Sequence, residues 1–119
     1  MTPKIFESEY RFMEILWERE PVSSSELVRL CLEKLEWKKS TTFTVIKRLS
    51  DRGVIKSENA VVTSIISKEE AQSAESMEIV EKNFSGSLPQ FVAAFTRKRE
   101  LTAQEIAEIQ RIIDAYKGE

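Results

Sequence analysis

Residues 40–67 read STTFTVIKRLSDRGVIKSENAVVTSIIS, and the spacing of the apolar residues changes partway along this stretch. Up to about Asp51 the apolar residues recur at helical spacing, which predicts an amphipathic helix. Gly53 then stands where the end of a helix favours a left-handed residue. The segments on either side of Asn59-Ala60 are rich in Val, Ile and Thr, which predicts a short β-hairpin.

Two further helices are predicted before this stretch. Apolar residues at helical spacing indicate the first over 7–17, and Pro21 disfavours helix in the residue before it. Ser23 and Glu26 have the Ser-x-x-Glu spacing of a capping box, which predicts the start of the second helix. Three helices followed by a hairpin are the element order of a winged helix-turn-helix, which we expect over residues 1–67.

Residues 68–119 have the pattern of three more amphipathic helices. Capping boxes begin at Ser67 and Thr102, and the break Ser85-Gly86-Ser87 separates the first two helices. Such short helices have too little internal core to cover their apolar faces, so a second chain is expected to cover them. The prediction is a mainly α chain with a small β-hairpin wing: a winged helix-turn-helix DNA-binding domain, then a three-helix dimerisation domain. The predicted dimerisation stripe consists of Phe91, Val92, Phe95, Ile106, Ile109, Ile113 and Tyr116.

The residue content argues against an enzyme. The chain has no histidine, which is the commonest general base and metal ligand. Its single cysteine, Cys31, allows neither an internal disulfide nor a cysteine metal cage. No glycine-rich phosphate loop or spaced acidic metal motif accompanies the carboxylates. We therefore expect no catalytic residue, no metal and no cofactor.

The hydropathy pattern predicts a cytoplasmic protein with no membrane partner. No apolar run approaches the roughly 20 residues that cross a bilayer. The first ten residues contain Lys4, Glu7 and Glu9, so no signal peptide is expected.

Positive charge is concentrated in one part of the chain. The net charge is -2, but residues 37–56 contain six bases and one acid, Asp51, which gives a local charge of +5. A phosphate backbone interacts with a local basic patch rather than with the average charge. The six bases are Lys38, Lys39, Lys47, Arg48, Arg52 and Lys56.

The predicted helix over 40–51 has hydroxyl and basic side chains opposite its apolar side. Lys and Arg neutralise phosphates, and a threonine methyl can contact a thymine methyl. Phe43 lies off the apolar side, where it can contact a thymine methyl or a sugar, or pack under the wing. The predicted DNA-binding residues are Lys38, Lys39, Ser40, Thr41, Phe43, Thr44, Lys47, Arg48, Arg52 and Lys56.

Two other interpretations stay open on these residues alone. A basic amphipathic helix is usually a solvated surface, so the domain could be a winged-helix module that binds another protein and no DNA. An enzyme would have to rely on carboxylates alone. A salt-sensitive shift of an operator-like duplex would separate a DNA-binding protein from the interaction module.

Short motifs along nearly the whole chain carry a family resemblance. They are Glu14-Ile-Leu-Trp17, Trp37 before Ser40-Thr-Thr, Ile46-Lys-Arg-Leu49 with Arg52-Gly53, and Ser67-Lys-Glu-Glu-Ala71. With the order of the three C-terminal helices, they resemble the penicillinase-repressor family of bacterial transcriptional repressors (the BlaI/MecI/CopY group). The resemblance implies a homodimer on a palindromic operator, with winged heads joined by intertwined C-terminal helices. It favours DNA binding and implies repression of β-lactam-resistance or related genes.

The resemblance also assigns positions within the recognition helix. Thr41, Thr44 and Arg48 match positions in that helix, and Lys39 and Ser40 lie at its start. We therefore expect base contacts mainly from Thr41, Thr44 and Arg48. The expected wing has a tight turn without a basic tip, so its phosphate contacts should be weak.

Two departures from the family pattern concern induction. Copper-sensing members carry paired Cys-x-Cys motifs, which this chain lacks, so copper sensing is not expected. Antibiotic-linked members are cut by a sensor protease at an Asn-Phe bond in the fifth helix, and the matching bond here is Ala94-Phe95. Ala94-Phe95 is thus a candidate proteolytic switch and a sensor protease a candidate partner. Because the Asn is missing, cleavage by the family's usual protease is not expected.

Overall fold

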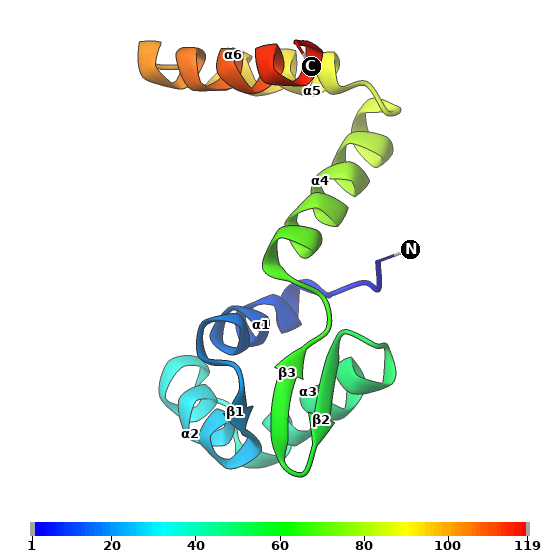
Figure 1. The fold of residues 1–119 in the computed structure, drawn as a ribbon, viewed down its shortest axis with the longest axis vertical. Helices are drawn as coiled ribbons and strands as arrows, with labels where there is room; N and C mark the ends of the chain where they lie inside the picture. Colours follow the sequence, from blue (N-terminus) through cyan, green and yellow to red (C-terminus); the bar gives the residue numbers. More distant parts are fainter. Residues whose placement is uncertain (1, 119) are drawn as a thin grey trace. The chain divides into compact units, whose positions relative to one another are not determined.

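The computed structural model describes residues 2–118, which form two compact units (Figure 1). The first unit ends at Ser76 and the second begins at Met77, so the division falls inside helix α4 (Lys68–Phe84). The domain boundary expected from the sequence, after residue 67, lies at the start of that helix. The chain is mainly helical with one small sheet, which confirms the predicted fold class.

The first unit has the element order of a winged helix-turn-helix (Figure 1). Its elements before α4 are α1 (Glu7–Arg19), β1 (Val22–Ser23), α2 (Ser24–Leu35), α3 (Lys39–Asp51), β2 (Ile55–Glu58) and β3 (Val61–Ser64). The hairpin of β2 and β3 was expected from the sequence, whereas the short strand β1 was not. The sheet is antiparallel in the order β1-β3-β2, and Val62 of β3 lies opposite Val22 on one side and Ser57 on the other.

Local capping starts the helices where the sequence predicts them. The Ser23 hydroxyl accepts a hydrogen bond from the Glu26 amide at 3.1 Å. The Glu26 carboxylate does not complete that box but pairs with Arg29 at 2.6 Å. At the start of α4 the box is complete, because Ser67 and Glu70 each accept a hydrogen bond from the other's amide. These bonds satisfy amides that the first helical turn leaves without partners.

Left-handed residues produce the turns around the wing. Gly53 has a φ of 80°, so the chain leaves α3 in a conformation that glycine adopts without a steric cost. Asn59 and Ala60 have φ values of 54° and 62°, the pattern of a tight two-residue hairpin turn. The Ser24 amide donates to the Ala60 carbonyl at 2.9 Å, which attaches this turn to the start of α2.

The core of the first unit lies between α1, α2, α3 and the sheet. Both tryptophans support it: the ring of Trp37 stacks on Phe12 with ring centres 6.2 Å apart, and Trp17 Nε1 donates to the Ile66 carbonyl at 2.9 Å. Cys31 is fully buried in this core, and burial raises the pKa of its thiol, as expected of a small apolar core residue. The largest fully buried side chains are Phe12, Met13, Leu16, Leu27, Leu30, Leu49 and Ile55.

The second unit contains the end of α4 followed by α5 (Leu88–Lys98) and α6 (Ala103–Lys117). Thr102 and Glu105 form a complete capping box at α6, and the Ser87 hydroxyl caps α5. Phe91 lies 5.5 Å from the ring of Phe84. No helix among the described residues is long and apolar enough to span a membrane.

Candidate nucleic-acid interface

Helix α3 has one buried and one exposed face, as the sequence pattern predicts. The buried side chains are Thr42, Val45, Ile46 and Leu49. The exposed side chains are Ser40, Thr41, Phe43, Thr44, Lys47 and Arg48. Phe43 is 41% exposed and lies among these exposed side chains of α3.

The cations around α3 differ in their contacts. Lys47 pairs with Asp51 one turn later at 3.3 Å. Both side chains are exposed, and a surface ion pair of this kind contributes little binding energy. The Lys39 ammonium lies 5.9 Å from the centre of the Phe43 ring. Lys38 and Arg48 are exposed, and no carboxylate within residues 2–118 pairs with either.

Arg52, which the sequence groups with these cations, points to another partner. Its guanidinium pairs with the buried Glu9 of α1 and lies 4.8 Å from the centre of the Phe6 ring. Its side chain is 28% exposed, against 78% for Lys47. The residues brought together on the exposed face of α3 therefore do not include Arg52.

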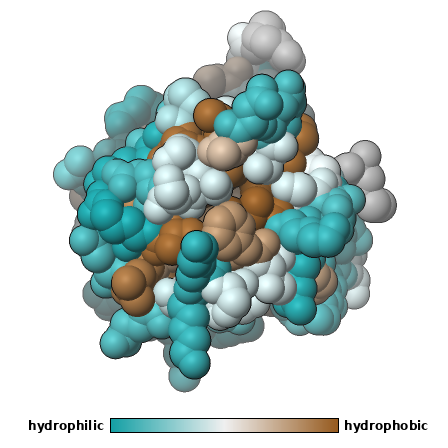
Figure 2. All heavy atoms as spheres, turned by 90° about the horizontal axis from the view of Figure 1, so that it is seen from below, coloured by the Kyte–Doolittle hydropathy of each residue, from teal (hydrophilic) through white to brown (hydrophobic). Residues whose placement is uncertain are grey.

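The wing adds little positive charge. Lys56 of β2 pairs with Glu58 on the same strand at 2.9 Å. The turn residues Asn59 and Ala60 are exposed and uncharged. Figure 2 shows the first unit from below, the side of the hairpin turn and α2 in Figure 1: hydrophilic side chains surround neutral and apolar ones. A strong phosphate contact from the tip of the wing is not expected.

Two carboxylates, one in the first turn of α1 and one directly after its end, hold the end of α3 and the wing, and sequence reasoning did not identify either. Glu20 accepts hydrogen bonds from the Ser64 amide at 2.7 Å and from the Ser64 hydroxyl at 2.8 Å. Glu9 holds Arg52 in the same way at the other end of the helix. Partners more than 40 residues apart leave no periodic signal in a sequence.

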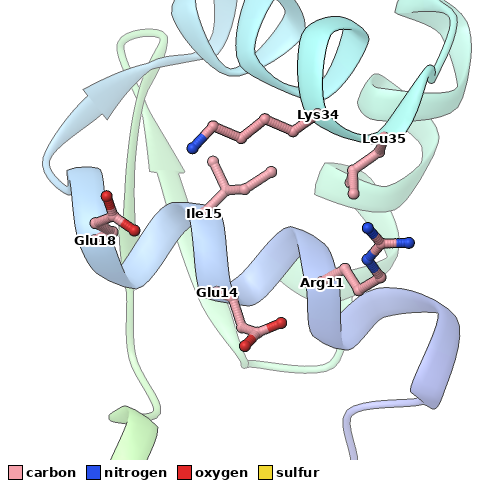
Figure 3. Close-up of a pocket in the computed structure, with 6 residues that line it drawn as sticks. All are labelled: Arg11, Glu14, Ile15, Glu18, Lys34 and Leu35. Atoms are coloured by element: carbon pink, nitrogen blue, oxygen red, sulfur yellow. The ribbon is translucent and has the colours of Figure 1, made fainter.

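A shallow groove of about 230 Å³ lies between α1 and α2 (Figure 3). Charged side chains of both signs are spread around Ile15 and Leu35. No group of metal-binding side chains occurs in the described part of the chain. The groove has neither the enclosure nor the converging polar groups of a ligand pocket.

The second unit leaves its apolar side chains uncovered. None of the described residues from 77 onward is buried. Of the predicted dimerisation stripe, Phe91 is half-buried and the other members are exposed: Val92, Phe95, Ile106, Ile109, Ile113 and Tyr116. Ile112 and Leu88, at 69% and 58% exposure, add to this surface and were not predicted.

The Ala94-Phe95 bond, the candidate site of proteolysis, lies inside α5. Ala94 is half-buried, and Phe95 is 46% exposed with the Arg99 guanidinium 5.7 Å from its ring centre. A bond inside a helix becomes accessible to a protease only when the helix unfolds locally.

Known proteins from several bacteria are similar to this chain over nearly its whole length. The family model described as "Penicillinase repressor" matches residues 5–115. The methicillin resistance regulatory protein MecI of Staphylococcus aureus (strain Mu50) is 26% identical over 117 residues, 95% of each chain. The penicillinase repressor of Bacillus licheniformis is 22% identical over 120 residues, which cover 98% of this chain and 94% of that protein. An uncharacterized 16.5 kDa protein of Latilactobacillus sakei is 28% identical over 118 residues, 96% of this chain and 81% of that protein.

Proposed function

The chain belongs to the penicillinase repressor family, and on this basis we propose that it is a sequence-specific, DNA-binding transcriptional repressor and not an enzyme. The observation that carries the proposal is the exposed face of α3, which combines threonine hydroxyls with cations. A duplex offers phosphates to the cations and base edges and thymine methyls to the threonines. One relative named as a methicillin resistance regulatory protein and another named as a penicillinase repressor match the chain over nearly its full length, which supports the proposed role.

The proposed contacts divide into two sets. Thr41, Thr44 and Arg48 contact base edges, because they lie on the exposed face and Arg48 has no competing carboxylate among the described residues. Arg is the residue best suited to bidentate contact with guanine. Arg52 is kept out of both sets because Glu9 holds its guanidinium. The phosphate and sugar set consists of Lys38, Lys39, Ser40, Phe43, Lys47 and Lys56.

The repressor is proposed to act as a homodimer on a palindromic operator, with heads formed by residues 1–67 and an arm formed by 68–119. Support comes from the apolar stripe on α5 and α6, in which every member except Phe91 is at least 44% exposed. A twofold dimer would bury the same stripe from both copies. It would also present two α3 helices to two half-sites.

Binding is predicted to weaken steeply with salt, and Lys47→Ala is predicted to make the dependence shallower. Each cation that neutralises a phosphate releases counterions and contributes roughly 0.9 to the slope of log K against log salt. Lys47→Ala should therefore lower that slope by about 0.9 for every duplex. Kd values measured by fluorescence anisotropy over a salt series would show it. Lys34→Ala, which removes a cation beside the α1–α2 groove (Figure 3), should leave the slope unchanged.

Sequence discrimination is predicted to depend on Arg48 and Thr44. Arg48→Ala and Thr44→Ala should each reduce the preference for a selected duplex over a random one by about 1–3 kcal/mol, because base contacts are lost. The selected duplex would come from repeated binding to a random pool, and both affinities would be measured at one salt concentration. Equal loss on both duplexes would contradict the assignment of these residues to base contacts. A random pool that yields no preferred sequence would favour the protein-interaction module instead.

The resemblance offers one candidate inducing event, although cleavage by the family's usual protease is not expected here. Cleavage at Ala94-Phe95 by a sensor protease would separate α6 from the head and remove part of the proposed dimer stripe. The bond lies inside a helix and lacks the Asn of the family pattern. Control of β-lactam-resistance genes and this proteolytic route both stay predictions.

A further inference from the structure

The contact between Glu9 and Arg52 lies at the end of the proposed recognition helix. The Glu9 side chain is 7% exposed, and its Oε1 accepts hydrogen bonds from the Arg52 guanidinium and, at 2.9 Å, from the Phe6 amide. The Phe6 ring lies 4.8 Å from Arg52 Cζ. Arg52 is thus held by a charge and by an aromatic face, both supplied by the start of α1.

The backbone of Arg52 belongs to the last turn of α3. Its amide donates to the Arg48 carbonyl at 3.1 Å, and the Val54 amide donates to the Leu49 carbonyl at 2.9 Å. Val54 in turn accepts a hydrogen bond from the Ile65 amide at 2.8 Å, which connects this turn to the wing. A restraint on Arg52 therefore restrains both the turn that carries Arg48 and the point where the wing begins.

A phosphate contact by Arg52 would require breaking this arrangement. Its guanidinium would have to leave Glu9, and the carboxylate would then remain buried with only the Phe6 amide as a partner. An uncompensated buried charge is unfavourable, so the pair competes strongly against a solvated phosphate.

We propose that Glu9 and Arg52 are positioning residues, which set the angle at which α3 presents Arg48 and Thr44 to the bases, and that Arg52 does not contact phosphate. This inference rests on the proposed DNA-binding function. The pair does not contribute binding energy directly. It keeps the recognition helix in one orientation, so that base contacts form without a rearrangement of the head.

Glu9→Gln is the most informative variant, because it keeps the shape of the side chain and leaves Arg52 in place. We expect affinity for the selected duplex to fall roughly 2- to 30-fold, the range that coupling through packed residues spans. Affinity for random duplex and the slope of log K against log salt should not change. Glu7→Gln is the matched control, since it removes an exposed acid from the same helix, and it should not weaken binding.

Two further variants test the same pair by changing Arg52 instead of Glu9. Arg52→Gln should reproduce the loss seen with Glu9→Gln, and the double variant should lose no more than either single one, since both break one interaction. Arg52→Lys keeps a positive charge that could bind phosphate but removes the planar guanidinium over Phe6, so it should also lose preference for the selected duplex.

Three results would overturn the inference. A slope reduced by about 0.9 in Arg52→Gln would make Arg52 a phosphate ligand. Stronger binding of both duplexes by Glu9→Gln would show that Glu9 merely sequesters a useful cation. A lower melting temperature with both affinities unchanged in the folded variants would make the pair purely structural. A wild-type chain with no preference for any duplex would instead remove the proposed function, and this inference with it.

Discussion

Ile109→Asp is expected to convert the proposed dimer to a monomer and to weaken binding to the proposed operator by about 10²- to 10⁴-fold. Ile109 is 44% exposed in the single chain and lies in the middle of the apolar stripe of α6. A carboxylate there would be buried without a partner when two copies associate, which is unfavourable. Each head would then bind its half-site alone and lose the effective concentration that linkage provides, which is worth about 10²–10⁴ in affinity.

Sedimentation equilibrium at micromolar concentration would give the oligomeric state, and titration of a palindromic duplex would give the affinity. Ala107→Asp is the matched control, because it adds the same charge on the exposed opposite side of the same helix. It should leave both measurements unchanged. A wild-type chain that sediments as a monomer would contradict the proposed dimer, and so would an Ile109→Asp variant that stays dimeric.

Leu30→Ala is expected to lower the free energy of unfolding of the first unit by about 2–5 kcal/mol. Leu30 is 2% exposed and packs in the core that supports α3. Truncation removes buried methyl groups and leaves a cavity, and the surrounding core can only partly collapse into it. Because small domains are stable by only about 5–15 kcal/mol, a loss of this size is a large fraction of the total free energy of unfolding.

Urea denaturation followed by tryptophan fluorescence would measure this loss, since Trp17 and Trp37 both pack against the same core. Leu32→Ala, on the same helix, makes the same chemical change at a side chain that is 58% exposed. It should change stability by no more than about 0.5 kcal/mol. Similar losses of stability in the two variants would contradict the burial pattern of the first unit. The exposed face of α3, which is proposed to contact DNA, is assigned from the same burial pattern.

Features set by neighbouring residues were predictable. The helix starts at Ser67 and Thr102 follow from capping pairs three residues apart, and both boxes are complete in the structure. The left-handed residue after α3 follows from Gly53. At α2 the same reasoning was incomplete, because Glu26 pairs with Arg29, three residues later, instead of completing the box with Ser23, three residues earlier. The two-residue strand β1 also went unpredicted, because its pairing with β3 depends on residues almost 40 positions later.

The sequence by itself determined the order of the helices, the hairpin and the two faces of α3, because periodicity and capping act within one or two helical turns. The sequence also predicted the apolar stripe of α5 and α6. Only the tertiary structure decided which cations of the basic segment are available. Counting charge between 37 and 56 treats Arg52 and Arg48 alike, yet one is held by Glu9 and the other is exposed. That difference depends on Glu9, which is 43 residues from Arg52 in the sequence. The Glu9 carboxylate reaches Arg52, away from water, only when the start of α1 packs near the end of α3.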